Sequence, residues 1–341
     1  MDRLGIGAAA LLMAASTASA APAAEKLEQP KVIIAVGGKS LFYYLPLTLA
    51  ERLGYFKDEG LDIQIVDFPG GAKALQAMVG GSADVVSGAF EHVVDMHAKG
   101  IEVQEFVLQD RYSGIVLGLT KAKAASYKSP KDLRGMKIGV TAPGSSTNIF
   151  VNALLARDGL APDAVSIIGV GASSGAVAAV QKGQVEGISN LDPVITRLEK
   201  GGDIVAVVDT RTPQGMQDVY GGAYAAGCLY ARTEFLRKNP NTAAAMASAM
   251  VRALLFLQKS TPDQIIATVP PEYYGDDKET YKAAFLKNKD GYSADGRMSI
   301  EAAEHVYKIL DAFEPAVKGK KIDLKQTFDN RFVEAALRKH K

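Results

Sequence analysis

Residues 129–147, SPKDLRGMKIGVTAPGSST, contain a helix start, a strand and a glycine-rich loop in direct succession. A helix is predicted to begin at Ser129-Pro130, because serine caps helices and proline suits the first helical position. The apolar run Lys137 to Val140 predicts a buried strand. The loop Ala142 to Thr147 ends the strand, and a further helix is predicted over Asn148 to Arg157. This succession is typical of an α/β sheet.

The same alternation extends to both sides of this stretch. Earlier strands are predicted at Lys31–Val36, Leu61–Phe68, Ala83–Val86, Val103–Leu108 and Gly114–Thr120, and helices at Tyr43–Leu53, Ala72–Val79 and Phe90–Ala98. Later strands are predicted at Val165–Val170, Val185–Ser189 and Ile204–Val208, and helices at Gly175–Lys182 and Asp192–Glu199. Two such units in series predict an α/β protein with two lobes, each a mostly parallel sheet flanked by helices.

The pattern changes from Glu234 onward, where strand signals become few. Helices are predicted over Thr242–Gln258, Thr280–Asn288 and Ile300–Phe313. This helical C-terminal tail is expected to pack back onto the first lobe. We therefore predict that residues 31–118 and about 225–341 form lobe 1, and that residues about 119–224 form lobe 2.

The first twenty residues have the features of a cleaved signal peptide, with an uncleaved anchor as the alternative. Arg3 supplies a short basic region, Leu4 to Ala15 is apolar but too short to span a bilayer, and Ala18-Ser19-Ala20 suits signal peptidase. No cysteine lies at the cleavage site, so no lipid anchor is expected there. No later stretch of about 18 apolar residues is seen, and a soluble periplasmic protein is predicted.

Composition argues against several classes of protein. The formal net charge is +1, which provides no strong field for nucleic acid. Four histidines and one cysteine leave little room for a metal site, and no cofactor is expected. Cys228 has small apolar neighbours and no histidine nearby in sequence, which predicts a buried structural thiol rather than a nucleophile. A monomer is expected.

Three stretches together resemble a known family. They are Pro46–Ile63, Gly70–Val85, and Ser129–Val140 followed by Pro143-Gly144-Ser145-Ser146. In this order they resemble the nitrate/sulfonate/taurine type of periplasmic binding protein, which is related to the bacterial thiamine-precursor binders. The resemblance runs from about Val32 to Val208, while the tail fits more loosely. The cysteine/histidine cluster of the related fungal enzymes is absent from the sequence.

The resemblance implies a type II-like periplasmic binding protein fold: a two-lobed clamp with a ligand cleft and a hinge of crossing strands. Such a clamp closes on a small-molecule ligand and delivers it to the membrane permease of an ATP-binding-cassette importer.

Candidate ligand-binding residues follow from the rule that ligands bind at the carboxyl ends of strands in open α/β sheets. They are Lys39, Ser40, Phe42, Tyr43, Gly70, Gly71, Ser87, Gly88, Ala89, His92, Arg111, Tyr112, Gly144, Ser145, Ser146, Thr147, Asn190, Asp192 and Tyr220. The strongest candidate is Gly144 to Thr147, where backbone N–H groups and hydroxyls at a helix start favour an anion. The alternative for Ser145 or Ser146 is an ordinary helix cap.

The other candidates also have structural alternatives. The aromatic residues Phe42 and Tyr43 could wall an organic ligand or pack in the core. Lys39 and His92 could face solvent instead of the cleft. Arg111 could grip a carboxylate or sulfonate, or form a salt bridge. Asp192 before Pro193 suits a helix cap.

The sequence therefore predicts a binding protein for a small organic anion, a sulfonate or carboxylate with an aromatic body among the options. A thiamine-precursor pyrimidine remains an alternative ligand. An enzyme on the same fold is the alternative from another class, although the sequence lacks a Gly-x-Ser-x-Gly elbow and a metal-binding histidine pair. A sensor that reports ligand to a membrane receptor is a third possibility.

Overall fold

The computed structural model describes residues 26–340, so the predicted signal peptide, residues 1–20, lies outside the described residues. Strands and helices alternate up to about residue 232, and only helices follow. The predicted α/β class with a helical C-terminal tail is confirmed.

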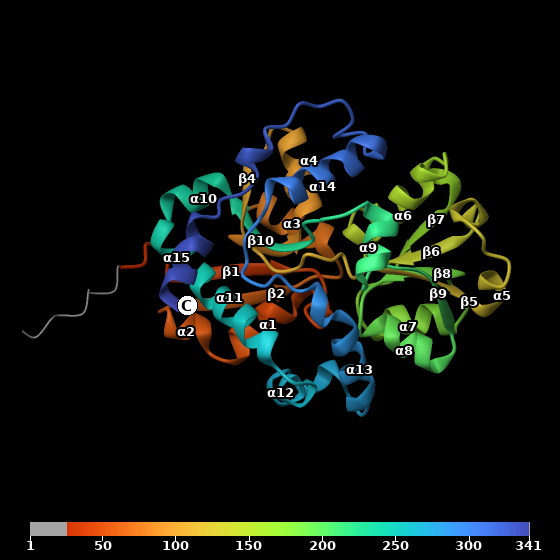
Figure 1. The fold of residues 1–341 in the computed structure, drawn as a ribbon, viewed down its shortest axis with the longest axis horizontal. Helices are drawn as coiled ribbons and strands as arrows, with labels where there is room; N and C mark the ends of the chain where they lie inside the picture. The colour runs from red at the N-terminus through yellow and green to blue at the C-terminus, as the bar shows by residue number, and fades with distance from the viewer. Residues whose placement is uncertain (1–25, 341) are drawn as a thin grey trace, which may run out of the picture.

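The first sheet has five strands in the order β2-β1-β3-β10-β4 (Figure 1). They are β1 (Lys31–Val36), β2 (Asp62–Asp67), β3 (Val85–Ala89), β4 (Val103–Leu108) and β10 (Gly227–Arg232). β1 pairs in parallel with β2 and β3, whereas β10 runs antiparallel to both β3 and β4. β3 is buried along its whole length, as strands covered by helices on both faces usually are.

The second sheet repeats this arrangement in the order β7-β6-β8-β5-β9. Its strands are β5 (Val116–Thr120), β6 (Lys137–Val140), β7 (Ser166–Gly169), β8 (Gly187–Asn190) and β9 (Ile204–Asp209). β6 is parallel to β7 and β8, and β5 is antiparallel to β8 and β9. Each sheet therefore has one antiparallel strand in fourth place. We use the terms first lobe and second lobe for each sheet with the helices that cover it.

Helices fill the connections within each lobe. In the first lobe these are α1 (Leu45–Arg52), α2 (Tyr55–Asp58), α3 (Gly71–Val79) and α4 (Phe90–Ala98). In the second lobe they are α5 (Lys121–Ala124), α6 (Ser146–Arg157), α7 (Ser174–Gln181) and α8 (Val194–Gly201). The helix predicted at Ser129-Pro130 is only a 3-10 turn, Pro130–Leu133, closed by a capping box with Asp132. It is short because Gly135 has a φ of 78° and turns the chain into β6.

The chain passes between the lobes through residues 109–115 and again through residues 210–226, which include α9 (Pro213–Tyr220). The tail then continues through α10 (Thr233–Lys238), α11 (Pro240–Lys259), α12 (Pro262–Thr268), α13 (Lys278–Asn288), α14 (Ile300–Phe313) and α15 (Arg331–His340). Short 3-10 turns lie at Phe42–Tyr44, Pro162–Ala164, Pro271–Tyr273, Lys289–Gly291 and Leu324–Gln326.

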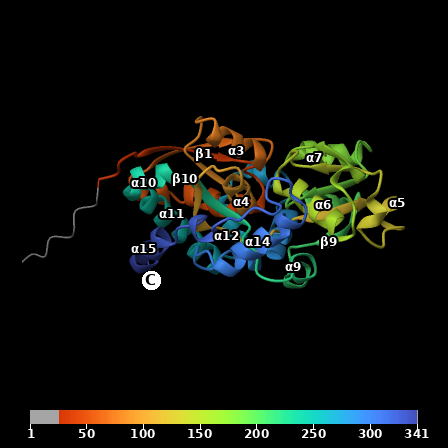
Figure 2. The same cartoon turned by 90° about the horizontal axis from the view of Figure 1, so that it is seen from above.

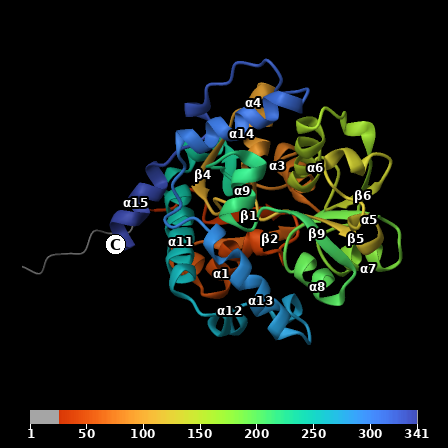
Figure 3. The same cartoon turned by 45° about the vertical axis from the view of Figure 1, so that its right-hand side comes forward.

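The tail contacts both lobes rather than the first alone. α11 packs on α1, α2, β4 and α15, all from the first lobe or the tail. However, α13 contacts α8, and α14 lies between α4 and α6 (Figures 1 and 3). Figure 2 shows the two lobes side by side, with tail helices close to their junction. Two tail helices therefore touch the second lobe.

α11 is the one described helix that is long and apolar enough to span a membrane. Within the fold, 67% of its apolar window is buried against other elements. Met246, Met250, Leu254 and Leu257 are all fully buried. The apolar character of α11 is therefore explained by its burial in the core of the first lobe.

Candidate ligand-binding cleft

The two sheets face each other with loops that follow the carboxyl ends of their strands. Between the lobes these loops enclose a central cavity with a volume of ≈ 20 Å³. Its walls are Gly37, Leu41, Tyr43, Tyr44, Gly71, Ala89, Ile115, Thr141, Ser145, Ser146, Thr147 and Leu191. A cavity of this size holds about one water molecule, so an organic ligand requires the lobes to move apart.

Several predicted ligand residues meet at this cavity although they are far apart in sequence. From the first lobe come Tyr43, Gly71 and Ala89, and from the second lobe come Ser145, Ser146 and Thr147. The other predicted residues do not line it: Lys39, Ser40, Phe42, Gly70, Ser87, Gly88, His92, Arg111, Tyr112, Gly144, Asn190, Asp192 and Tyr220. The strand-end rule therefore selects some residues that line this cavity and others that lie away from it, and their role in ligand binding stays a prediction.

The start of α6 contacts the first lobe directly. Ser145 precedes the helix but its side chain does not cap it. Instead the Ala72 N–H, at the start of α3, donates to Ser145 Oγ at 3.0 Å. The Gly144 carbonyl accepts from His92 Nε2 at 3.3 Å. The loop predicted to hold an anion is therefore hydrogen-bonded to groups of the first lobe. The Ser145 side chain does not cap α6, so the alternative role as a helix cap does not apply to it.

Glu91 places a carboxylate beside this helix start. It is 2% exposed in the first turn of α4. Ser146 Oγ donates to Glu91 Oε2 at 3.3 Å across the lobe boundary, and the Tyr224 hydroxyl donates to Glu91 Oε1 at 2.7 Å. Burial raises the pKa of the Glu91 carboxyl, and these hydrogen bonds oppose that effect. The negatively charged group next to the N-terminus of α6 is thus the Glu91 carboxylate of the protein rather than a bound anion.

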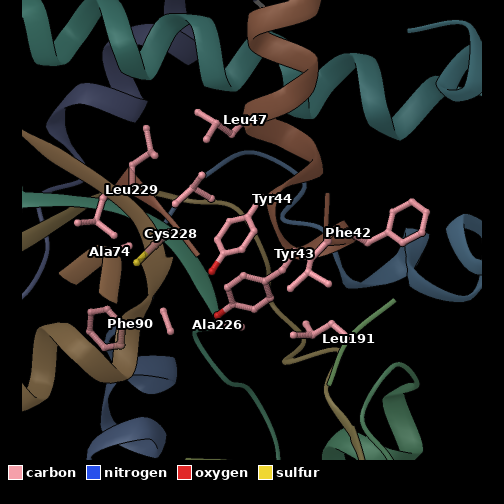
Figure 4. Close-up of a cluster of buried hydrophobic side chains, with 14 of the residues drawn as sticks. Phe42, Tyr43, Tyr44, Leu47, Ala74, Phe90, Leu191, Ala226, Cys228 and Leu229 are labelled. Carbon is pink, nitrogen blue, oxygen red and sulfur yellow. The ribbon is translucent and has the colours of Figure 1, made fainter. Parts of the chain in front are cut away.

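Tyrosine rings surround the same region. Tyr43 and Tyr44 lie edge to face, with ring centroids 5.2 Å apart, and Figure 4 shows their hydroxyls pointing toward Ala226. Tyr220 and Tyr224 stack with centroids 4.0 Å apart. The Glu91 charge adds to burial in raising the pKa of Tyr43, Tyr220 and Tyr224. Of these rings, Tyr224 contacts Glu91 directly through its hydroxyl.

A second small space, the hinge cavity, adjoins the central cavity through Tyr43 and Leu191. Its volume is also ≈ 20 Å³. Its walls are Phe42, Tyr43, Asp110, Tyr112, Ser113, Gly114, Leu191, Arg211, Asn288, Gly291 and Tyr292. Asp110 is 4% exposed, and its Oδ2 has no hydrogen-bond partner among the described residues. Burial raises the pKa of Asp110 well above its usual value.

Arg211 is the only arginine or lysine in the described walls of these two cavities. Its guanidinium is 2% exposed and forms ion pairs with Asp209 at 2.6 Å, Asp192 at 3.1 Å and Glu199 at 3.2 Å. Asp192 also accepts from the Thr196 N–H, in the first turn of α8, at 2.7 Å, although the N-cap position of this helix is Pro193. Three carboxylates surround one guanidinium, which leaves Arg211 little capacity to bind an anion.

The remaining predicted residues serve other contacts. Lys39 pairs with Glu51 at 2.7 Å, beside the half-buried Ser40. Ser87 Oγ bonds to the Gln109 amide, and Asn190 Nδ2 donates to the Gly171 carbonyl. A Cβ on Gly88 would approach Tyr230 to 3.0 Å, and one on Gly70 would lie 2.9 Å from Ser145 Oγ. These glycines permit close packing.

The aromatic and cationic candidates divide between the core and the surface. Phe42 packs on Tyr281 of the tail, with ring centroids 4.5 Å apart. Arg111 is exposed and donates to the Asp290 carbonyl at 3.0 Å, with its guanidinium over Tyr112. Tyr220 donates to Ser113 at 3.3 Å. His92 is buried, which lowers its pKa, and Nδ1 faces the Tyr230 hydroxyl.

Glu91, Asp110, Tyr224 and Arg211 were not predicted as site residues. Glu91 and Asp110 each directly precede a predicted residue in sequence, His92 and Arg111. That adjacency was the only local signal, because their burial depends on contacts between distant segments. Cys228 is buried, as predicted, and burial raises its pKa well above the usual value. Among residues 26–340, no cluster of His, Cys, Asp and Glu could hold a metal ion.

Known proteins are similar to this chain in sequence and in fold. A solved structure from Bordetella bronchiseptica RB50 is 51% identical, with 93% of this chain and 99% of that chain covered and a TM-score of 0.89. The alkanesulfonate-binding protein SsuA from Xanthomonas axonopodis pv. citri, bound to MOPS, is 16% identical, with 89% and 100% covered and a TM-score of 0.71. The latter similarity shows that the fold is that of a periplasmic binding protein.

Among curated relatives, the 4-amino-5-hydroxymethyl-2-methylpyrimidine phosphate synthase of Schizosaccharomyces pombe is 27% identical over 148 residues. That match covers 42% of this chain and 40% of the relative, so less than half of either protein is aligned. The family model described as NMT1/THI5 like matches residues 42–265, which is more than half of the chain. The chain therefore belongs to the NMT1/THI5-like family.

Proposed function

We propose that this protein is an extracytoplasmic solute-binding protein, which captures a small organic solute between its lobes and delivers it to the permease of an ATP-binding-cassette importer. The observation that carries the proposal is the meeting of strand-end loops from both sheets at one cavity. Contacts that close this cavity run between the lobes, so opening and closing changes access to it. The alkanesulfonate-binding neighbour of the same fold supports the proposal.

The proposal includes the division of the chain into moving parts. We propose that residues 31–118 with about 225–341 form one body and residues about 119–224 the other. The direct lobe contacts, such as the Phe42 N–H to the Asp192 carbonyl at 2.9 Å, are the ones that would break on opening. Periplasmic localisation follows from the same function and from the signal peptide expected over residues 1–20.

Ligand capture is tested by thermal denaturation of the purified protein with alkyl sulfonates, carboxylates, nitrate, pyrimidines and amines. A solute at 100 times its dissociation constant is expected to add about 2.7 kcal/mol of stability. X-ray scattering should show a smaller radius of gyration with the same solute. A well-folded protein that responds to none of these classes, nor to an extract of the cells that produce it, would contradict solute capture.

The enzyme alternative rests on the partial match to the pyrimidine phosphate synthase. It is tested by incubating each stabilising solute with the protein and analysing it by mass spectrometry. Recovery of the unchanged solute supports binding alone, whereas a product supports catalysis. Co-purification with a membrane permease would support transport, and co-purification with a receptor would support the sensor alternative.

A further inference from the structure

The cleft is acidic where the sequence predicts a site for an anion. Glu91 accepts a hydrogen bond from Ser146, which lines the central cavity, and Asp110 lies in the wall of the hinge cavity. Both side chains are almost completely buried. Tyr43 lines both cavities, so the two spaces adjoin. The two carboxyl groups therefore border adjoining parts of the cleft, Asp110 in the wall of the hinge cavity and Glu91 behind Ser146 of the central cavity.

Asp110 has unused hydrogen-bonding capacity. Its Oδ2 is buried without a partner among the described residues and lies against Gly227, where an added Cβ would clash with it. A buried carboxylate without a partner lowers stability, and a ligand that donates to it would remove that cost. Native proteins rarely retain such a group without a compensating role.

Glu91 gains a free hydrogen-bond acceptor when the lobes open. One of its two hydrogen-bond donors, Ser146, belongs to the second lobe, whereas Glu91 belongs to the first. Separation of the lobes removes this donor and leaves Oε2 to a ligand. Tyr224 donates to this carboxylate, and the Tyr220 ring stacks on Tyr224. Aromatic faces together with a carboxylate form favourable surroundings for a cation.

No available positive charge offsets these carboxylates in the cavity walls. Arg211, the only cation in the described walls, is paired with three carboxylates. Lys39 is paired with Glu51. Arg111 is exposed, donates to the Asp290 carbonyl, and lines a larger surface hollow that meets the hinge cavity only at Tyr112. An anion in the cleft would therefore lose its hydration next to Glu91 and Asp110 without a matching cation.

We propose that the solute is a small organic cation, an ammonium or amidinium, whose N–H groups bind Glu91 and Asp110. This proposal rests on the proposed function, the capture of a solute between the lobes. Small sulfonates and carboxylates without such a group are excluded. This proposal replaces the anionic solute that the sequence predicts.

The test compares probes that share a carbon skeleton and differ in charge. Benzylamine and benzamidine are set against benzoate, and butylamine is set against butanesulfonate, by thermal denaturation and calorimetry. At least one cation is expected to bind saturably, and its matched anion is not. Glu91→Gln and Asp110→Asn should each weaken cation binding at least tenfold, while Glu102→Gln, at an exposed position before β4, should leave it unchanged.

The outcomes separate this proposal from solute capture itself. Binding of anions in preference to their matched cations would overturn the cation proposal and leave solute capture intact. Binding of neither class would also overturn it, and the extract experiment above then decides on capture. Asp110→Asn is expected to fold with an unfolding midpoint at or above that of the wild type, because it removes an unpaired buried acid. Loss of cation binding in that variant therefore reports on the site rather than on misfolding.

Discussion

Glu105 on β4 is fully buried, and neither of its carboxylate oxygens has a hydrogen-bond partner among residues 26–340. Burial raises the pKa of this group well above its usual value, and the charge of Asp329 adds to the effect. The folded protein therefore holds this proton more tightly than the unfolded chain. Its contribution to stability is present below the unfolded pKa and is lost as the pH rises through the folded pKa.

We expect Glu105→Gln to stabilise the protein at pH 8 by about 1–3 kcal/mol, because it removes an unpaired buried acid. The difference from the wild type should shrink as the pH falls toward 4. Urea denaturation between pH 4 and pH 8 measures this difference. Glu102→Gln, at the exposed position directly before β4 and three residues before Glu105, is the matched control. A destabilised Glu105→Gln at pH 8 would show that the carboxylate has a partner in solution.

Replacement of Arg211 is expected to lower the stability of the protein, in contrast to replacement of Glu105. Its guanidinium holds Asp192, Asp209 and Glu199 together in a largely buried cluster. Arg211→Met removes the cation that the three carboxylates share, while Glu199 keeps its ion pair with Lys287 at 2.9 Å. The loss of the buried partner should cost about 3–5 kcal/mol of unfolding free energy. Arg197→Ala, at an exposed position on α8, the helix that carries Glu199, should change stability by less than about 0.5 kcal/mol. Equal losses in both variants, measured in urea, would contradict a structural role for the cluster.

At the residue scale, sequence reasoning placed Tyr43, Gly71, Ala89 and Ser145–Thr147 at the central cavity because the strand-end rule depends only on local order. It did not find Glu91 or Asp110. In the sequence each is an ordinary acidic residue beside an apolar segment. Their burial comes from β10, from the second lobe and from the tail, which lie more than fifty residues away in the chain.

At the scale of elements, Gly70 fits α3 against the loop before α6. Its φ of −170° is accessible to any residue, so an alanine there is limited only by space. An added Cβ would lie 2.9 Å from Ala142 Cβ and from Ser145 Oγ across the lobe boundary. The substitution therefore acts on lobe closure rather than on the fold of either lobe.

We expect Gly70→Ala to disfavour the closed arrangement by about 1–3 kcal/mol, the usual cost of overpacking, and to weaken ligand binding accordingly. X-ray scattering should show a larger radius of gyration, with an unchanged unfolding midpoint for each lobe. Gly175→Ala, in the first turn of α7, is the control, because its Cβ would lie 3.4 Å from the Val170 carbonyl. An unchanged radius of gyration and an unchanged ligand affinity in Gly70→Ala would show that the contact of position 70 with Ala142 and Ser145 does not limit closure of the lobes.

Most elements were predictable, with α4 and α14 matching their predicted bounds, because their apolar periodicity is clear. β10 was missed. Its sequence Gly-Cys-Leu-Tyr-Ala-Arg has no alternation, since the strand is buried on both faces. Its strand partners β3 and β4 lie over a hundred residues earlier, so only tertiary structure identifies it.

For the whole molecule, hydrogen exchange should separate lobe motion from unfolding. The N–H groups of Phe42 and Ala72 donate across the lobe boundary, to the Asp192 carbonyl and to Ser145 Oγ. The N–H groups of β1, by contrast, lie within the first sheet, where β1 pairs with β2. Without ligand we expect the first pair to exchange at least tenfold faster than those of β1, and a bound solute should slow them selectively. Equal protection of both sets without ligand would indicate that the lobes do not separate.

The position of β10 also constrains how the protein can be made. β3 and β4 pair with β10 and not with each other, and β10 follows the entire second lobe in the chain. While a ribosome is still producing residues 109–226, the first sheet consists of β2, β1 and β3 alone, and β4 has no place in it. A nascent chain therefore cannot complete its first lobe before its second, and vectorial synthesis keeps the edges of β3 and β4 open until residue 232 has emerged.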